Sequence, residues 1–150
     1  MGSARSNESK NHAWMFLFLC WVVTLVATAG SLFFSEVMHF PPCVLCWYQR
    51  ICMYPLVFIY FAGLFPLNRS VLRFTVPLLF TGWIMALYHI LVYHGVIPES
   101  LTPCTEGVSC AAVFFEWFGF ISIPVLSFTA FTVLLILSFC FKVEVSKYEK

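Results

Sequence analysis

The chain has 150 residues, of which 61% are hydrophobic and only 10% are charged. A soluble domain has about a quarter of its residues charged, so this composition indicates a protein surrounded by lipid. The net charge of +1, with no run of basic residues, argues against a nucleic-acid partner.

Four apolar stretches approach the roughly 20 residues that a helix needs to cross the hydrocarbon core of a membrane. They predict an all-α fold, an integral membrane four-helix bundle with residues 1–150 in a single domain. The longest connection has only about two dozen residues, too few for a second domain. The predicted spans are residues 14–34, 47–65, 74–93 and 118–141.

The first stretch carries no charge and follows a polar segment that contains Arg5 and Lys10. A cleaved signal peptide is the alternative, with Ala27, Thr28 and Ala29 as its small-residue cleavage site. The apolar run continues past that site to residue 34, which a signal peptide does not need. We therefore favour a retained membrane span.

A Cys-x-x-Cys pair, Cys43 and Cys46, directly precedes the second stretch. Free N–H groups and the dipole at a helix N-terminus favour a thiolate, which is the form of cysteine that attacks disulfides. Pro41 and Pro42 interrupt any preceding helix and leave the pair at the mouth of the span. The pair is therefore predicted to be redox-active.

Arg50 lies four residues after Cys46, one helical turn deeper on the same face. A charge inside a membrane is costly, so function is the default interpretation, and extension of the side chain to the outer surface is the alternative. The guanidinium could stabilise a cysteine thiolate and the reduced form of a quinone. Gln49 and Tyr48 add hydrogen-bonding groups at the same depth, whereas Trp47 is interpreted as an interfacial aromatic residue.

Two histidines, His89 and His94, lie near the outer end of the third stretch. His94 is nearest the surface and is the first candidate for a group that hydrogen-bonds or protonates a quinone. His89 and, beside the first cysteine pair, His39 are weaker candidates. Each of the three can equally be an ordinary interfacial side chain.

A second cysteine pair, Cys104 and Cys110, lies in the connection between the third and fourth stretches. The five residues between these cysteines are enough for a disulfide, which a soluble partner could reach. The other cysteines lie within apolar stretches and are interpreted as small buried hydrophobic residues. These are Cys20, Cys52 and Cys140.

The positions of lysine and arginine predict the orientation of the chain, because positive residues beside spans stay on the cytoplasmic side. Apart from Arg50, they lie before the first span, between the second and third, or after the fourth. The other two connections contain glutamate but no lysine or arginine. We therefore expect cytoplasmic termini and both cysteine pairs on the outer, oxidising side, where disulfides persist.

Other interpretations of the two pairs stay open. Both could be structural disulfides, or the first pair could carry a soft metal through a transporter. A four-cysteine zinc site is a further alternative, but the second pair has unusual spacing and no histidine is adjacent. We favour electron transfer between two dithiols on one side of the membrane, and we expect no metal.

The run CVLCWYQR, from Cys43 to Arg50, resembles the signature of the DsbB family of disulfide-bond formation proteins. The resemblance covers nearly the whole chain, through its four spans and the positions of its two dithiols. The compact second pair and residues 117–124 are similar to the BdbC-like branch of this family. Gln49 stands where some relatives carry an acidic residue.

The resemblance implies a quinone-dependent disulfide oxidoreductase in the bacterial cell (inner) membrane. Cys104 would form a mixed disulfide with a DsbA-like thioredoxin-fold partner outside the cytoplasm, and Cys110 would complete that pair. Cys43 would exchange with the second pair, and Cys46 would face the quinone, helped by Arg50. The cofactor would be ubiquinone or menaquinone. Gln49 and His94 are further contacts that we predict from their positions in the sequence.

Overall fold

The computed structural model describes residues 2–65, 67–98, 110 and 122–148, with side chains described between residues 7 and 147 of these ranges. The described residues form four α-helices and one short π-helix, and they contain no strand, which confirms the all-α class. In chain order the elements are α1 (Gly2–Leu32), η1 (Phe33–Val37), α2 (Val44–Gly63), α3 (Val71–Tyr93) and α4 (Ile123–Tyr148).

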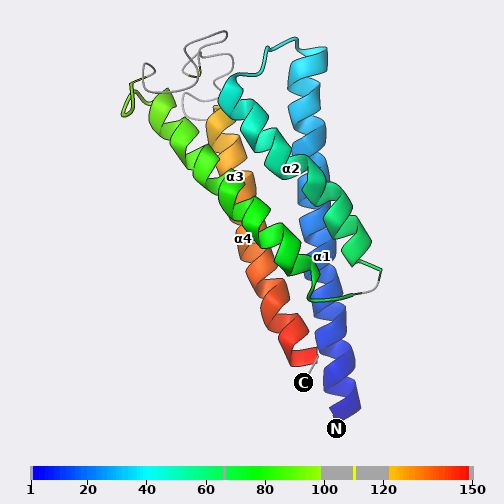
Figure 1. The fold of residues 1–150 in the computed structure, drawn as a ribbon. Helices are drawn as coiled ribbons and strands as arrows, with labels where there is room; N and C mark the ends of the chain where they lie inside the picture. The colour runs from blue at the N-terminus through cyan, green and yellow to red at the C-terminus, as the bar shows by residue number, and fades with distance from the viewer. Residues whose placement is uncertain (1, 66, 99–109, 111–121, 149–150) are drawn as a thin grey trace.

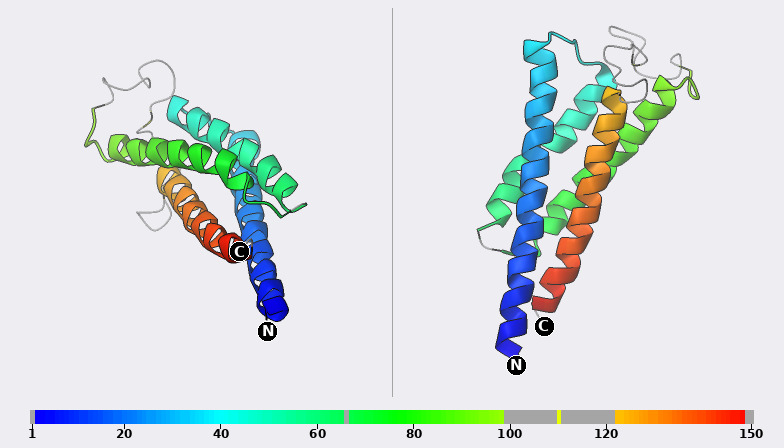
Figure 2. Two further views of the ribbon diagram at one scale, coloured as in Figure 1. Left: turned by 60° about the horizontal axis from the view of Figure 1, so that its bottom comes forward. Right: turned by 180° about the vertical axis from the view of Figure 1, so that it is seen from behind.

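The four helices form an up-and-down bundle. Helix α1 packs against α2 and α4, and α3 packs against the same two helices. Both termini lie at one end of the bundle, and α2 begins at the opposite end (Figure 1). Seen from behind, α1 and α4 run side by side (Figure 2). The first cysteine pair, at the start of α2, is therefore remote from both termini.

All four helices are long and apolar enough to cross a membrane, as expected from the sequence. Their bounds differ from the predicted spans, because a helix begins at its N-cap, which local hydrogen bonds set, and not where an apolar run begins. Helices α2 and α3 each begin three residues earlier than predicted, at Val44 and Val71. The beginning of the predicted fourth span, residues 118–121, lies outside the described residues.

The C-terminus of α3 is a Schellman motif around Gly95. The N–H of Val96 donates to the carbonyl of Leu91 at 2.9 Å, and that of Gly95 donates to the carbonyl of Val92 at 3.0 Å. Gly95 has φ +70°, a left-handed conformation that glycine adopts without steric cost. The helix therefore stops at Tyr93, and His94 lies beyond it as the cap.

Large apolar side chains lie on both the inside and the outside of the bundle. Leu56, Leu79 and Phe131 are fully buried between helices. Phe58 and Phe139 are 75% and 65% exposed, each on the outer side of its helix. Aromatic surfaces of this size are costly in water and are accepted by lipid, so the exposed apolar faces agree with a membrane location.

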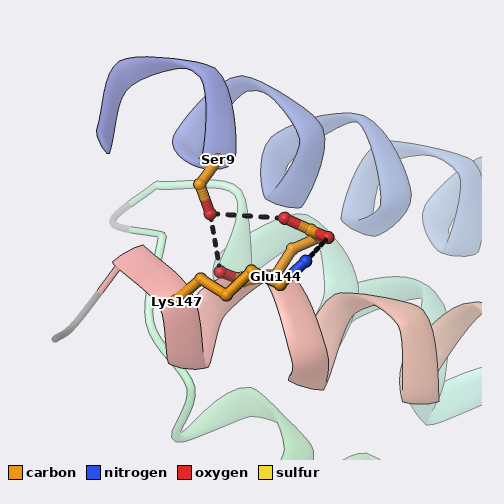
Figure 3. Close-up of polar contacts among 3 residues, drawn as sticks. All are labelled: Ser9, Glu144 and Lys147. Atoms are coloured by element: carbon orange, nitrogen blue, oxygen red, sulfur yellow. Dashed lines mark hydrogen bonds and ion pairs between the residues drawn. The ribbon is translucent and has the colours of Figure 1, made fainter. Parts of the chain in front are cut away.

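Polar contacts join α1 to α4 near the termini (Figure 3). The Ser9 hydroxyl donates to the backbone carbonyl of Glu144 at 2.9 Å and lies 3.3 Å from the side-chain Oε2 of Glu144. Lys147 pairs with the other carboxylate oxygen of Glu144 at 2.7 Å. The lysine is exposed, so the buried Ser9 contact is the more specific link between the two helices.

A second polar cluster lies inside the bundle. Tyr60 and Ser138 share a hydrogen bond of 2.8 Å between their hydroxyls, and the Cys20 sulfur lies 4.0 Å from the Ser138 hydroxyl. Cys20 and Cys52 are buried free thiols, and Cys140 is a half-buried one. These three cysteines lie in helices, as the sequence predicts.

Candidate functional site

The first cysteine pair is built into the N-terminus of α2. Cys43 is the N-cap, with an extended backbone, and its sulfur accepts a hydrogen bond from the backbone N–H of Cys46 at 3.3 Å. Pro41 and Pro42 precede this cap outside the helix. Cys43 thus occupies the position where serine or aspartate usually caps a helix, and its sulfur meets the positive end of the helix dipole.

The two thiols of this pair touch each other. Cys43 and Cys46 are free cysteines whose sulfur atoms lie 2.9 Å apart. The hydrogen bond from Cys46 lowers the pKa of Cys43 well below its ordinary value, and burial opposes this effect. His89 and the backbone N–H of Cys46 lower the pKa of Cys43 further. These contacts favour the charged form of Cys43 when the pair is reduced.

His89 of α3 contacts both the first cysteine pair and Cys110. Its Nε2 lies 3.7 Å from the Cys43 sulfur and 3.2 Å from the backbone carbonyl of Cys110. Its Nδ1 lies 3.1 Å from the Gln49 amide nitrogen, one and a half turns into α2. The imidazole is 2% exposed, so these contacts hold it in a fixed orientation.

Arg50 is anchored on α1. Its Nε donates to the Ser31 hydroxyl and its Nη2 to the Ser31 carbonyl, both at 2.9 Å. The guanidinium carbon lies 5.5 Å from the centre of the Trp47 ring, a cation–π distance. A guanidinium has five N–H groups, so these two bonds leave others for an acceptor in the site.

A cavity of about 460 Å³ joins these groups. Its polar lining includes Cys43, Cys46, Gln49, Arg50 and His89, and its remaining walls are mainly apolar. Helix α1 contributes one side, with residues between Val23 and Ser31, and α4 contributes another, with residues between Ile123 and Phe131. The cavity therefore opens between the helices that surround the start of α2.

The site residues predicted from the sequence are not all brought together. Arg50, Gln49 and both cysteines of the first pair line the cavity, together with Cys110, which is buried and disulfide-bonded. Cys104 lies outside the described residues.

The order of the histidine candidates is reversed in the structure. His94, our first candidate for the quinone, is exposed, stacks edge-on against Tyr93, and does not line the cavity. His89, the weaker candidate, lies in the cavity wall. His39 is exposed and has a positive φ of 54°.

Two further results could not be read from the sequence pattern. Ser31 holds Arg50, yet its hydroxyl gave no signal beyond being a polar residue near the outer end of an apolar run. Tyr48, expected to add a hydrogen-bonding group at the depth of Arg50, is exposed on the surface instead. Trp47 is also exposed, which agrees with its interpretation as an interfacial aromatic residue.

The chain matches known proteins over most of its length. The family described as disulfide bond formation protein DsbB matches residues 10–141. Disulfide bond formation protein C of Bacillus subtilis is 41% identical over 133 residues, 89% of this chain and 96% of the relative. A probable disulfide formation protein of Oceanobacillus iheyensis is 44% identical, over 81% of this chain and 84% of the relative.

A third relative, a probable disulfide formation protein of Metapseudomonas resinovorans, is 40% identical over 83% of this chain and 87% of the relative. No solved structure matches the chain significantly. The site described above, with its paired cysteines, therefore lies within the matched region.

Proposed function

The chain belongs to the DsbB family of membrane disulfide bond formation proteins, and from that premise we propose that it passes electrons from an extracytoplasmic thiol protein to a membrane quinone. The electron donor would be a DsbA-like protein with a thioredoxin fold. The observation that carries the proposal is one cavity whose wall contains both Cys46 and Arg50.

The chemistry of this cavity suits a quinone head group, whether ubiquinone or menaquinone. A quinone is flat and apolar, with carbonyl oxygens that accept hydrogen bonds. The cavity volume of about 460 Å³ falls in the range of small-molecule sites, about 300–1,000 Å³. Arg50 supplies N–H donors that could bind the quinone carbonyl oxygens, and the mainly apolar walls suit the flat ring.

A bound quinone would supply the capacity to accept two electrons and two protons. When the first pair is oxidised, Cys43 and Cys46 join in a disulfide and lose the same two electrons and two protons. Cys46 is half-exposed to the cavity, whereas Cys43 is buried beside His89. Arg50 lies one turn deeper and places a fixed positive charge where negative charge develops.

Electrons would enter the first pair from the second by thiol–disulfide exchange. A thiolate of the Cys104–Cys110 pair attacks the Cys43 sulfur of an oxidised first pair, a new S–S bond forms, and Cys46 leaves as a thiolate. The other cysteine of the second pair then displaces Cys43. The second pair becomes the disulfide and the first becomes the dithiol.

The contact between His89 and the Cys110 carbonyl supports this exchange, because it keeps residue 110 beside Cys43. Cys110 is in a disulfide while Cys43 and Cys46 are free thiols. In the proposed relay this is the state that follows exchange between the pairs and precedes electron transfer to the quinone.

We place the cysteine end outside a bacterial cell (inner) membrane, with both termini in the cytoplasm. Arg69 lies in the connection between α2 and α3, and Arg73 lies in the first turn of α3. That connection is at the end of the bundle that holds the termini (Figure 1). Lys142 and Lys147 lie in the last turns of α4 at the same end. Positive residues concentrate on the cytoplasmic side, which supports this orientation.

Quinone reduction by purified, detergent-solubilised protein tests the proposal, with a reduced DsbA-like protein as the electron donor. We expect turnover to disappear in Cys46→Ser and to fall about a hundredfold in Arg50→Ala, since the latter removes a donor to developing negative charge. Cys52→Ser is the matched control, because Cys52 is a buried free cysteine on the same helix that does not line the cavity. Normal turnover in Cys46→Ser would refute the relay.

A further inference from the structure

The fold brings a histidine from a distant part of the sequence to the first cysteine pair. No histidine is adjacent to Cys46 in the chain, and this argued against a metal site. Helix α3 nevertheless brings His89 to the pair from 43 positions further along the sequence. The two sulfur atoms and a ring nitrogen of His89 all lie within 4.8 Å of one another.

This spacing is close to that of a tetrahedral zinc-type site. Zinc binds cysteine sulfur at about 2.3 Å and histidine nitrogen at about 2.0 Å, so a sulfur and a nitrogen on one ion lie about 3.5 Å apart. The Cys43 sulfur and His89 Nε2 are 3.7 Å apart. Two sulfurs bound to one ion lie about 3.8 Å apart. The distance between the Cys43 and Cys46 sulfurs is 2.9 Å and has to increase, which rotation of the half-exposed Cys46 side chain allows.

The surroundings of the three groups complete the requirements for a metal site. Gln49 contacts Nδ1 of His89, and such a contact orients a histidine that binds metal through its other nitrogen. Metal binding through Nε2 ends its contact with the Cys110 carbonyl and moves the ring proton to Nδ1. The Gln49 carbonyl oxygen then accepts from Nδ1–H once the amide is turned over. The cavity gives a cation a route to Cys46 and leaves space for water as a fourth ligand.

We propose that the reduced Cys43–Cys46 pair and His89 form a binding site for a thiophilic d10 cation, of which Zn²⁺ and Cd²⁺ are representatives. Binding forms two metal–sulfur bonds and one metal–nitrogen bond, and it releases the protons that the two sulfur atoms carry at that pH. No electron moves in this step. The disulfide form of the pair has no thiolate to offer, so the site exists only in the reduced state.

Such a site would make the pair sensitive to metal ions. A cation held by both sulfurs prevents them from joining in a disulfide, so the first pair would stay reduced. This consequence depends on the proposed function, because it concerns the relay. Metal binding itself does not depend on it, and it is measured without quinone or electron donor.

The experiment is a titration of full-length protein, without a histidine tag, after reduction and removal of the reductant. Co²⁺ serves as the optical probe, since its visible bands report tetrahedral geometry and its ultraviolet band reports bonds to thiolate. We expect one Co²⁺ per chain, displaced by Zn²⁺, and no such bands in the oxidised protein. Tetrahedral bands of equal strength in the oxidised protein would overturn the proposal.

His89→Ala and His94→Ala form a matched pair of variants. His94 lies on the same helix end but is exposed and outside the cavity. We expect His89→Ala to weaken Co²⁺ binding by at least tenfold. Replacing a residue that only orients a metal ligand already weakens binding by about tenfold to a hundredfold, and His89 would be a ligand itself. His94→Ala should bind Co²⁺ as wild type does. Equal affinities in the two variants would contradict a role for His89.

A measurement on the wild-type protein covers the case in which His89→Ala does not fold. X-ray absorption of the zinc-loaded protein should show two sulfur neighbours and the outer-shell scattering of one imidazole. Two sulfurs without imidazole scattering would refute the site as proposed. Cys46→Ser should lose the ultraviolet thiolate band that Cys52→Ser keeps, which separates this site from the buried cysteines elsewhere in the helices.

Discussion

Replacement of Gly82 by alanine should destabilise the bundle through its contact with Phe131. A Cβ at position 82 would lie inside contact distance of the Phe131 ring, with its Cδ1 at 3.0 Å and two further ring atoms closer. The ring is fully buried, packs between the helices and borders the cavity on one side, so it has to shift to admit the new Cβ. Overpacking costs about 1–3 kcal/mol, and we take the upper part of this range for a fully buried ring.

The gain in helix propensity offsets part of this cost. Alanine is favoured over glycine in a helix by about 1 kcal/mol, so the net loss for Gly82→Ala is about 1–2 kcal/mol of unfolding free energy. Gly30→Ala is the control, because a Cβ there has no neighbour within 4 Å. Gly30→Ala should therefore show only the gain in helix propensity, which raises the free energy of unfolding by about 0.5–1 kcal/mol.

Reversible unfolding in mixed detergent micelles, followed by circular dichroism, measures both variants. The stability of Gly82→Ala should fall below that of wild type and that of Gly30→Ala should rise above it. If Gly82→Ala were as stable as Gly30→Ala, the close packing of α3 on α4 at this position would be refuted.

Three further predictions concern the site and the core. Ser31→Ala removes the hydroxyl that accepts from Arg50 at 2.9 Å and leaves the contact with the backbone carbonyl. It should raise the KM for quinone about fivefold, which is equivalent to about 1 kcal/mol. An unchanged KM in steady-state assays would contradict this role of Ser31. Because the pKa of Cys43 is lowered, its charged form is favoured. The thiolate absorbance of the reduced protein should therefore persist as the pH falls below about 8.5, where an ordinary thiol is protonated, and disappear only at lower pH. A Cys43→Ser variant should lack this low-pH absorbance, and its persistence there would assign the thiolate elsewhere. Tyr60→Phe removes a buried hydrogen bond of 2.8 Å to Ser138 and should cost about 1–2 kcal/mol in the micelle unfolding assay, whereas unchanged stability would show that the bond contributes nothing.

The sequence determined the features of this protein that depend on neighbouring residues. Apolar stretches of membrane-spanning length predicted four helices, since helix formation and membrane insertion depend on local composition. The Pro-Pro-Cys-x-x-Cys order predicted a cysteine pair at a helix N-terminus, and Cys43 is the N-cap of α2. Arg50 follows Cys46 by one turn, so helical periodicity alone placed both in one wall of the cavity.

The choice between the two histidines required the tertiary structure. His89 and His94 are five residues apart, which is about 140° around an α-helix, so they cannot share a face. Helix α3 is apolar nearly all round, and its sequence therefore does not indicate which side faces its neighbours. Packing against α2 turns His89 inward to Cys43, and the Schellman motif leaves His94 outside.

The cavity and its anchors also follow from packing between distant segments. Ser31 meets Arg50 only because η1 and the turn after it return the chain so that α2 lies against α1. The Cys43–Cys46–His89 group likewise combines two helices whose rotation about their own axes is set by the fit of side chains in the core. Local sequence determines which residues can form a helix, but the relative rotation and crossing of helices depend on close packing over the whole bundle.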